Sequence, residues 1–275
     1  MNTKFLALTG LAALVLTACG GGSDDHGSND TSTTTPAPAT TTPPVTTPPA
    51  TTQPTITASA EGVYEGTYAN GLTHLTLVTD TSRMYSILGT TTGGVFAISR
   101  FLEGLGTSTN GAFTATEVRE YGTGASTASG TFTGTYVPGT SLNGTLALGG
   151  ANIAITGAPL SNTTYVYNTP AKLANITGAW TLNDLNGARV TLLVEADGKF
   201  TGTSGTCAIT GSLTPKSTGK NVFTFSVTSG PAPCPRPNDV STGVAVEFTI
   251  GTARQLIAAA SGVTRVNGTG WVGAR

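Results

Sequence analysis

The chain has few charged residues, few histidines and few cysteines. Only 10% of its 275 residues are charged and its formal net charge is −1, so it lacks the basic surface that a nucleic-acid partner requires. Of its two histidines, only His74 lies in the part expected to fold, which leaves a serine or cysteine hydrolase a single candidate base. No Gly-x-Ser-x-Gly motif and no phosphate-binding glycine-rich loop with a lysine occurs.

The other candidates for chemistry have simpler structural interpretations. Residues 268–273 match the dinucleotide-binding pattern, but the chain ends two residues later, so we expect a terminal strand. Glu117 and Glu120 fall on opposite faces of a strand. Glu61 and Glu65 share a face at a domain edge, which leaves a carboxylate pair for glycoside hydrolysis open. We predict no enzyme, no catalytic residue and no cofactor.

The chain has two histidines, His26 and His74, and neither indicates a metal site. His74 alternates with Thr76 on the face opposite two leucines, which predicts an exposed histidine on the polar side of a strand. Asp24, Asp25 and His26 have the side chains of metal ligands, but no second histidine lies nearby. We therefore predict a solvated spacer there and no metal site.

The first nineteen residues have the pattern of an export signal. Lys4 supplies a positive flank, residues 5–16 form an apolar run too short to span a bilayer, and Ala18 precedes Cys19 as cleavage requires. The segment Leu16-Thr17-Ala18-Cys19 resembles the lipobox of bacterial lipoproteins, which implies that Cys19 becomes the acylated first residue, carrying palmitate or a similar chain. The alternative is an ordinary signal peptide with an incidental cysteine.

With the glycines and the Thr/Pro-rich segment that follow, this signal is similar to those of proteobacterial outer-membrane lipoproteins. Gly20, where an aspartate would retain the protein, implies sorting to the outer membrane, on a face that stays open. A tether carrying two β-rich lobes is also similar in layout to surface lipoproteins of the transferrin-binding and factor-H-binding kind. That similarity is architectural, has no specific motif and transfers no binding residues.

The segment after Cys19 is predicted to be a disordered tether. Seven of the fifteen prolines lie between residues 36 and 54, among threonines and alanines, which favours extended polyproline II. The predicted organisation is a lipoprotein signal peptide (1–18), a lipid anchor and Thr/Pro tether (19–59), a first β-lobe (60–168), a joint (169–175) and a second β-lobe with a disulfide (176–275).

An internal repeat without gaps divides the folded part. Residues 62–84 align with residues 178–200 at a constant offset of 116. In each copy an Asn-Gly pair, beginning at Asn70 or Asn186, separates two strand-like runs, which predicts a hairpin with a type I′ turn. Chance similarity among Gly/Thr-rich strands is the alternative, because the match fades after residue 200. Matched positions include Gly62 with Gly178, Tyr64 with Trp180, and Leu77 with Leu193.

Strand signals recur about every ten to fifteen residues with close turns between them. In one strand Gly130, Phe132, Gly134 and Tyr136 share a face, as expected of a strongly curved sheet in which a glycine makes room for a ring. The predicted fold class is all-β, with two tandem small antiparallel β-barrel or β-sandwich lobes. A single sixteen-stranded barrel is the competing prediction, but outer faces rich in Thr and Ser suit water rather than lipid.

The two lobes differ in charge and in tyrosine content. Residues 60–168 hold six acidic and three basic residues, a net charge of −3, whereas residues 172–275 hold nine basic and five acidic residues, a net charge of +4. Opposite charges would help the lobes to dock. All seven tyrosines lie in the first lobe, where they either form a recognition surface or line the core.

Cys207 and Cys234 remain as an even pair in a chain with an export signal. Cys207 lies on a predicted strand and Cys234 in the proline-rich loop 231–237. We predict a structural disulfide that clips this loop to the sheet, contributing about 3 to 4 kcal/mol on chain-entropy grounds. A catalytic or metal-binding thiol pair is the alternative, but no Cys-x-x-Cys and no histidine occurs in this half.

We predict a lipid-anchored cell-envelope lipoprotein that acts as a non-catalytic binding module for a protein or a small ligand. The alternatives are a structural or accessory envelope protein and a glycan-acting hydrolase. Expected partners are the membrane, through Cys19, and an envelope or extracellular protein, but no nucleic acid. A buried apolar cavity within one barrel would favour a small ligand, a flat tyrosine-rich patch would favour a protein partner, and carboxylates clustered in a cleft would favour catalysis. The ligand-binding residues stay unknown at this point.

Replacing Cys19 tests the lipid anchor. Because Cys19 is the only membrane-binding feature that we predict, Cys19→Ser should give a protein that is released from membranes or keeps its signal peptide. Fractionation of cells and the mass of the N-terminal peptide measure both outcomes. A cleaved Cys19→Ser protein that still sediments with membranes would contradict the lipoprotein interpretation.

Overall fold

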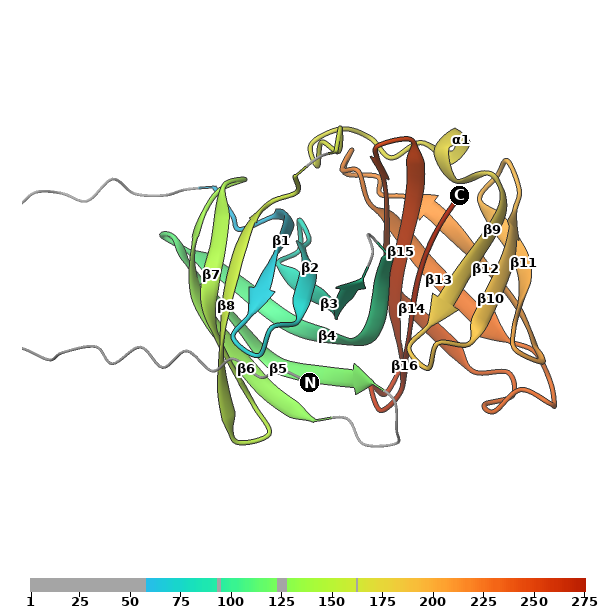
Figure 1. Cartoon of the computed structure of the whole chain (residues 1–275), viewed down its shortest axis with the longest axis horizontal. Helices are drawn as coiled ribbons and strands as arrows, with labels where there is room; N and C mark the ends of the chain where they lie inside the picture. Colours follow the sequence, from blue (N-terminus) through green and yellow to red (C-terminus); the bar gives the residue numbers. More distant parts are fainter. Residues whose placement is uncertain (1–57, 93–94, 123–127, 162) are drawn as a thin grey trace, which may run out of the picture. The chain divides into compact units, whose positions relative to one another are not determined.

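The computed structural model describes residues 58–92, 95–122, 128–161 and 163–275. Within these residues, sixteen strands form two closed antiparallel barrels of eight strands each (Figure 1). The prediction of an all-β chain with two tandem lobes is confirmed, and both lobes are barrels rather than sandwiches. In the described part of the chain, no helix has the length and apolar character needed to cross a bilayer.

Each barrel is a meander in which every strand pairs with its neighbours in sequence. The strands of the first barrel are β1 (Gly62–Tyr68), β2 (Thr73–Val78), β3 (Arg83–Thr92), β4 (Val95–Thr109), β5 (Ala112–Gly122), β6 (Ser129–Val137), β7 (Ser141–Leu148) and β8 (Ala151–Pro159). The second barrel follows the one-turn helix α1 (Leu173–Ile176) and consists of β9 (Gly178–Asp184), β10 (Arg189–Val194), β11 (Lys199–Ser204), β12 (Cys207–Pro215), β13 (Phe223–Ser229), β14 (Val240–Ile250), β15 (Ala253–Gly262) and β16 (Gly268–Ala274). The first barrel closes where β8 pairs with β1, and the second where β16 pairs with β9.

Glycines make room for rings inside the first barrel, as predicted. Phe132 and Tyr136 are buried in its core. A Cβ atom on Gly134 would lie 2.9 Å from the ring of Phe132, and one on Gly144 only 2.6 Å from it. A side chain at either position would displace that ring, so the curvature of the sheet and the size of its core depend on these glycines.

The 116-residue repeat also appears in the way each barrel is closed. The Tyr64 hydroxyl donates a hydrogen bond to the carbonyl of Ala60 (3.0 Å), and Trp180 Nε1 donates to the carbonyl of Ile176 (2.6 Å). Both pairs are four residues apart and correspond at the offset of 116. Ala60 and Ile176 are fully buried, so the residue two positions before the first strand closes the same end of each barrel.

The predicted type I′ turns are wrong. Gly71 (φ 84°) and Gly187 (φ 75°) have left-handed backbones, but the asparagine before each of them does not. The amide of Gly71 donates to the carbonyl of Tyr68, and that of Gly187 to Asp184. Each loop is therefore a type I turn followed by a left-handed glycine, the usual form of a three-residue hairpin loop, and the Asn-Gly pair occupies its last two positions.

A third apolar cluster lies between the two barrels and was not predicted. Most of its members are outward-facing side chains of β2, β3 and β4 on one barrel and of β14, β15 and β16 on the other. We expected outer faces of threonine and serine, yet residues 256–260 of β15 are all buried. A strand buried on both faces has a continuous apolar run instead of an alternating one. The buried members are Val63, Leu75, Leu77, Tyr85, Ile87, Ile98, Phe101, Tyr121, Leu185, Val222, Val244, Val246, Phe248, Ile257, Ala259 and Val272.

Ion pairs accompany this cluster and follow the opposite charges of the two lobes. Lys216 pairs with Asp80, and Lys220 with Glu61 at 2.8 Å. A third basic residue of the second barrel, Arg265, pairs with two carboxylates of the first barrel. Those carboxylates belong to Glu117, at 3.2 Å, and to fully buried Glu103, at 3.6 Å. The predicted electrostatic docking is thus present as specific pairs.

Gly268 allows β16 to approach the first barrel and provides a test of this packing. A Cβ atom there would lie 2.7 Å from Phe101 Cζ and 2.8 Å from Tyr121 Cδ1, two rings that stack at 4.5 Å. We expect Gly268→Ala to lower the free energy of unfolding by about 1 to 3 kcal/mol, since overpacking displaces both rings. Urea unfolding measures this loss.

The matched control is Gly122→Ala, whose Cβ atom would meet its nearest neighbour at 3.6 Å, an ordinary contact. Its urea midpoint should stay within error of the unaltered chain. Equal midpoints for Gly268→Ala and Gly122→Ala would show that the contact between the barrels tolerates a methyl group, against this account.

Candidate ligand-binding site

A cavity of about 640 Å³ lies among the turns at one end of the second barrel. Figure 1 shows that this end is the one opposite α1. The cavity lies among the β9–β10, β11–β12 and β15–β16 turns and the long β13–β14 loop. The volume is typical of pockets for small molecules, and an eight-stranded barrel has an interior wide enough for one such ligand. This cavity is therefore the candidate functional site.

The floor of the cavity is the indole of Trp271. This side chain is 2% exposed and packs edge to face against Phe225, with 5.0 Å between ring centroids, and against Phe200 at 6.3 Å. Phe200 and Phe225 do not line the cavity, so they fill the barrel beneath the indole. Trp271 Nε1 has no hydrogen-bond partner among the described residues.

Four short hydroxyl side chains form the inner wall above this floor. Strand alternation directs them inward, because each shares a face with a core residue of its own strand, such as Phe200 for Ser204 or Trp271 for Thr269. None of the four hydroxyls has a hydrogen-bond partner within the part of the chain that the structure describes. They are Ser204 on β11, Ser229 on β13, Ser241 on β14 and Thr269 on β16.

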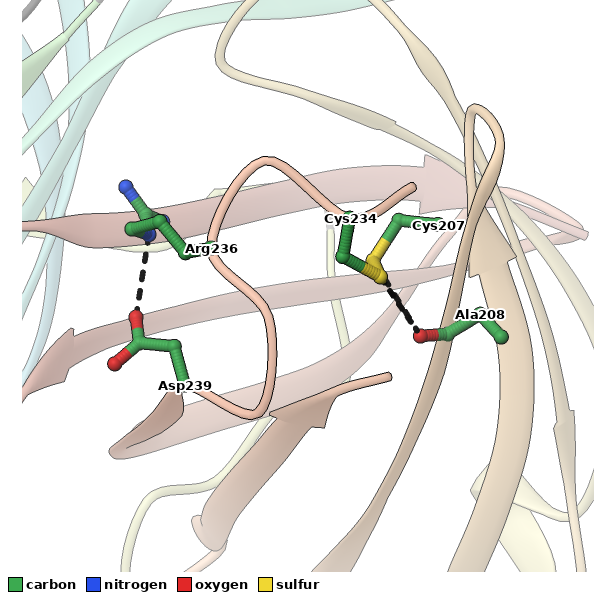
Figure 2. The surroundings of a disulfide bond; sticks show 5 residues. All are labelled: Cys207, Ala208, Cys234, Arg236 and Asp239. Atoms are coloured by element: carbon green, nitrogen blue, oxygen red, sulfur yellow. Dashed lines mark hydrogen bonds and ion pairs between the residues drawn. A yellow bond between two sulfur atoms is a disulfide. The ribbon is translucent and has the colours of Figure 1, made fainter. Parts of the chain in front are cut away.

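The charged groups around the cavity are already partnered. Asp184 accepts hydrogen bonds from two backbone amides of the β9–β10 turn, both at 2.8 Å. Asp239 pairs with Arg236 at 3.2 Å (Figure 2) and accepts a hydrogen bond from Asn267 Nδ2 at 3.1 Å. The amide oxygen of Asn267 is buried without a partner among the described residues. Among the described residues the cavity therefore presents neutral polar groups without partners, while its acidic side chains accept hydrogen bonds and its one basic side chain, Arg236, is paired.

The predicted disulfide between Cys207 and Cys234 is confirmed. It joins the start of β12 to the β13–β14 loop, and both cysteines are buried (Figure 2). The sulfur of Cys234 lies 3.5 Å from the carbonyl oxygen of Ala208, a contact and not a hydrogen bond because a disulfide sulfur carries no hydrogen. Cys207 also lines the cavity, as do Pro235 and Arg236 of the loop, so the disulfide holds part of the cavity wall in place.

The first barrel contributes to the same wall. Tyr121 and Gly122, at the end of β5, line the cavity. The Tyr121 hydroxyl donates a hydrogen bond to the carbonyl of Arg265 at 3.1 Å, and the Arg265 side chain binds Glu117 in return. Residues of both barrels therefore line the site. The sequence of one barrel alone does not predict this shared lining.

His74 is not exposed, contrary to the prediction. It is 3% exposed and lies inside the first barrel, where Nε2 donates a hydrogen bond to the carbonyl of Thr156 at 2.9 Å. Nδ1 must then accept, and it does so from Thr76 at 2.8 Å. Thr76 accepts from Ser86 at 2.7 Å, and Ser86 from Tyr68 at 3.3 Å. Burial lowers the pKa of His74, so the imidazole is a neutral link in this chain of hydrogen bonds.

The other sequence candidates do not converge on a catalytic cleft. Glu117 pairs with Arg265, and Glu120 with Arg100 at 2.7 Å beside a smaller cavity of about 180 Å³ in the first barrel. Glu65 accepts a hydrogen bond from the amide of Ser161. Residues 268–273 form part of β16, as expected. Among the described residues, no three His, Cys, Asp or Glu side chains come together as metal ligands. Cys19 and residues 24–26 lie outside the described residues.

Comparison with known proteins finds similarity among solved structures alone. No protein-family model and no curated protein matches the chain. A protein of unknown function of the DUF3598 family from Nostoc punctiforme matches with a TM-score of 0.26 and 12% identity, over 78% of this chain and 96% of that one. Isotype 1 transferrin binding protein B from Neisseria meningitidis serogroup B matches with a TM-score of 0.22 and 11% identity, over 74% of this chain and 66% of that one. Neither similarity identifies a function for this chain.

The buried histidine predicts an acid-dependent loss of stability. As the pH falls below about 6.5, the unfolded chain binds a proton at His74 that the folded barrel resists, so the free energy of unfolding should decrease. His74→Gln keeps a donor for Thr156 and removes the titration, so its urea midpoint should depend less on pH between 7.5 and 5. His26→Gln is the control and should behave like the unaltered chain. An unchanged pH dependence in His74→Gln would show that other groups cause the loss.

Proposed function

We propose that this chain is a non-catalytic binding module of the bacterial cell envelope, held by lipid at Cys19, whose second barrel binds a small ligand. The cavity of about 640 Å³ at the mouth of that barrel is the observation that carries this proposal. Its floor is an indole with an unused N–H, and its wall carries hydroxyls without partners. Buried polar groups are normally satisfied, so the buried indole N–H without a partner suits an occupant that accepts its hydrogen bond, and the wall hydroxyls suit one that replaces the water at their surface.

The positions of the tyrosines favour a small ligand over a protein partner. Tyr64, Tyr68 and Tyr136 lie in the core of the first barrel, and Tyr85 and Tyr121 in the cluster between the barrels. The remaining two, Tyr165 and Tyr167, pack against that same cluster. No flat tyrosine-rich patch forms on the described surface. The second barrel does contain a cavity, although it is open at one end and lined by hydroxyls, unlike the buried apolar cavity expected from the sequence.

The location rests on the N-terminal sequence. The segment from Leu16 to Cys19 and the Thr/Pro-rich stretch after it support a lipid anchor at the outer membrane with a long tether. A tethered barrel with one open end meets diffusing solutes while it stays at the membrane. Placed there, the module would take up or hold a compound that passes through the envelope.

Recovery of a bound compound tests the proposal. The full chain, purified in detergent, is incubated with an extract of cell envelopes, washed, denatured and examined by mass spectrometry for released small molecules. We expect a compound that Thr269→Phe retains at least about tenfold less, because the added ring occupies the cavity.

Thr201→Phe is the matched control, since Thr201 is exposed on the outer face of β11 and does not line the cavity. It should retain the compound as the unaltered chain does. Equal release from the unaltered chain and Thr269→Phe, or no release from either, would count against a ligand in the second barrel.

A further inference from the structure

We infer, on the basis of the proposed ligand site, that its ligand is a neutral polyhydroxylated compound, that is, a saccharide. The inference comes from the kinds of polar groups that the cavity leaves without partners. Each of these groups has a limited set of hydrogen bonds that it can make, and together they restrict the chemistry of the occupant.

The hydroxyls of the inner wall disfavour an apolar ligand. Ser204, Ser229, Ser241 and Thr269 face the cavity without partners among the described residues. A fatty acyl chain or an aromatic ring would displace water from these hydroxyls and return no hydrogen bond, at a cost of about 1 to 3 kcal/mol for each one. A sugar hydroxyl both donates and accepts, so it can match a serine or threonine in either direction.

The balance of charge disfavours an anionic ligand. Asp184 accepts hydrogen bonds from two backbone amides at one oxygen and has no basic partner among the described residues, and Asp239 is held by Arg236 and Asn267. Among the described lining residues the only cation is Arg236, which is already paired, so an anion such as a phosphate would lie near both carboxylates. A neutral ligand does not meet this repulsion.

Two residues that line the cavity each have a buried atom without a hydrogen-bond partner among the described residues, and one of these atoms needs an acceptor while the other needs a donor. Trp271 Nε1 can only donate a hydrogen bond, and Asn267 Oδ1 can only accept one. A compound with several hydroxyl groups supplies both functions from one kind of group.

Tryptophan fluorescence provides the test, because the chain has only two tryptophans. Trp180 lies at the closed end beside Arg275, so in Trp180→Phe the emission comes from Trp271 alone. The full chain is titrated with maltotriose, cellotriose and chitotriose, and separately with palmitate and inorganic phosphate, in a detergent without a sugar head group. We expect at least one oligosaccharide to change the emission saturably, and palmitate and phosphate to leave it unchanged.

Removing hydroxyls should weaken that binding. Ser241→Ala combined with Thr269→Val should raise the dissociation constant for the active oligosaccharide at least about tenfold. Thr201→Val with Thr203→Val, on the outer face of β11, is the control and should not change it. Calorimetry on the chain with both tryptophans repeats the titration independently of the Trp180→Phe fold.

The outcomes separate this inference from the proposed function. Palmitate or phosphate binding without oligosaccharide binding would leave a ligand site in the second barrel and overturn the saccharide. No binding of any oligosaccharide at concentrations up to about 10 mM would also overturn it. Oligosaccharide binding that survives the loss of both hydroxyls would place the sugar outside this cavity and overturn the inference as well.

Discussion

Strand number sets the width of a closed barrel, and both barrels of this protein have eight strands. With the strand number equal, the size of the inward side chains contributes to whether the open end is filled core or cavity. In the first barrel that end is lined mostly by apolar side chains, five of them leucines such as Leu88, Leu102 and Leu146, and about 180 Å³ remains. In the second barrel serines and a threonine stand there above Trp271, and about 640 Å³ remains. The two barrels thus share one topology, but side chains fill the first more completely than the second.

Much of this architecture follows from local sequence patterns. Strand alternation and regular turns indicate two small all-β lobes, the constant offset of 116 indicates their repeat, and Cys234 in a loop of prolines indicates the staple to Cys207. These features are local or involve few alternatives, so residue types constrain them strongly. The turns at Gly71 and Gly187 show the limit, because an Asn-Gly pair fits two hairpin loops that differ in length by one residue.

The remainder depends on contacts between distant parts of the chain. Alternation at His74 shows that β2 has two distinct faces, but both are buried, the leucines against the other barrel and the histidine inside its own. Period-two patterns cannot tell which of two buried faces is the interior. The run of buried residues from Leu256 to Ala260 was the signal for a strand covered on both sides. The cavity was not predictable, because serines on the inner face of a strand resemble serines on an outer one.

The disulfide between Cys207 and Cys234 bears on when the wall of the cavity is completed. It fixes the β13–β14 loop, whose residues Pro235 and Arg236 are part of the cavity wall. Such bonds form in oxidising compartments and are kept reduced in the cytoplasm. For the exported chain that we propose, the wall would be completed only in an oxidising compartment. A ligand in the finished cavity would then come from that compartment and not from the cytoplasm where the chain is made.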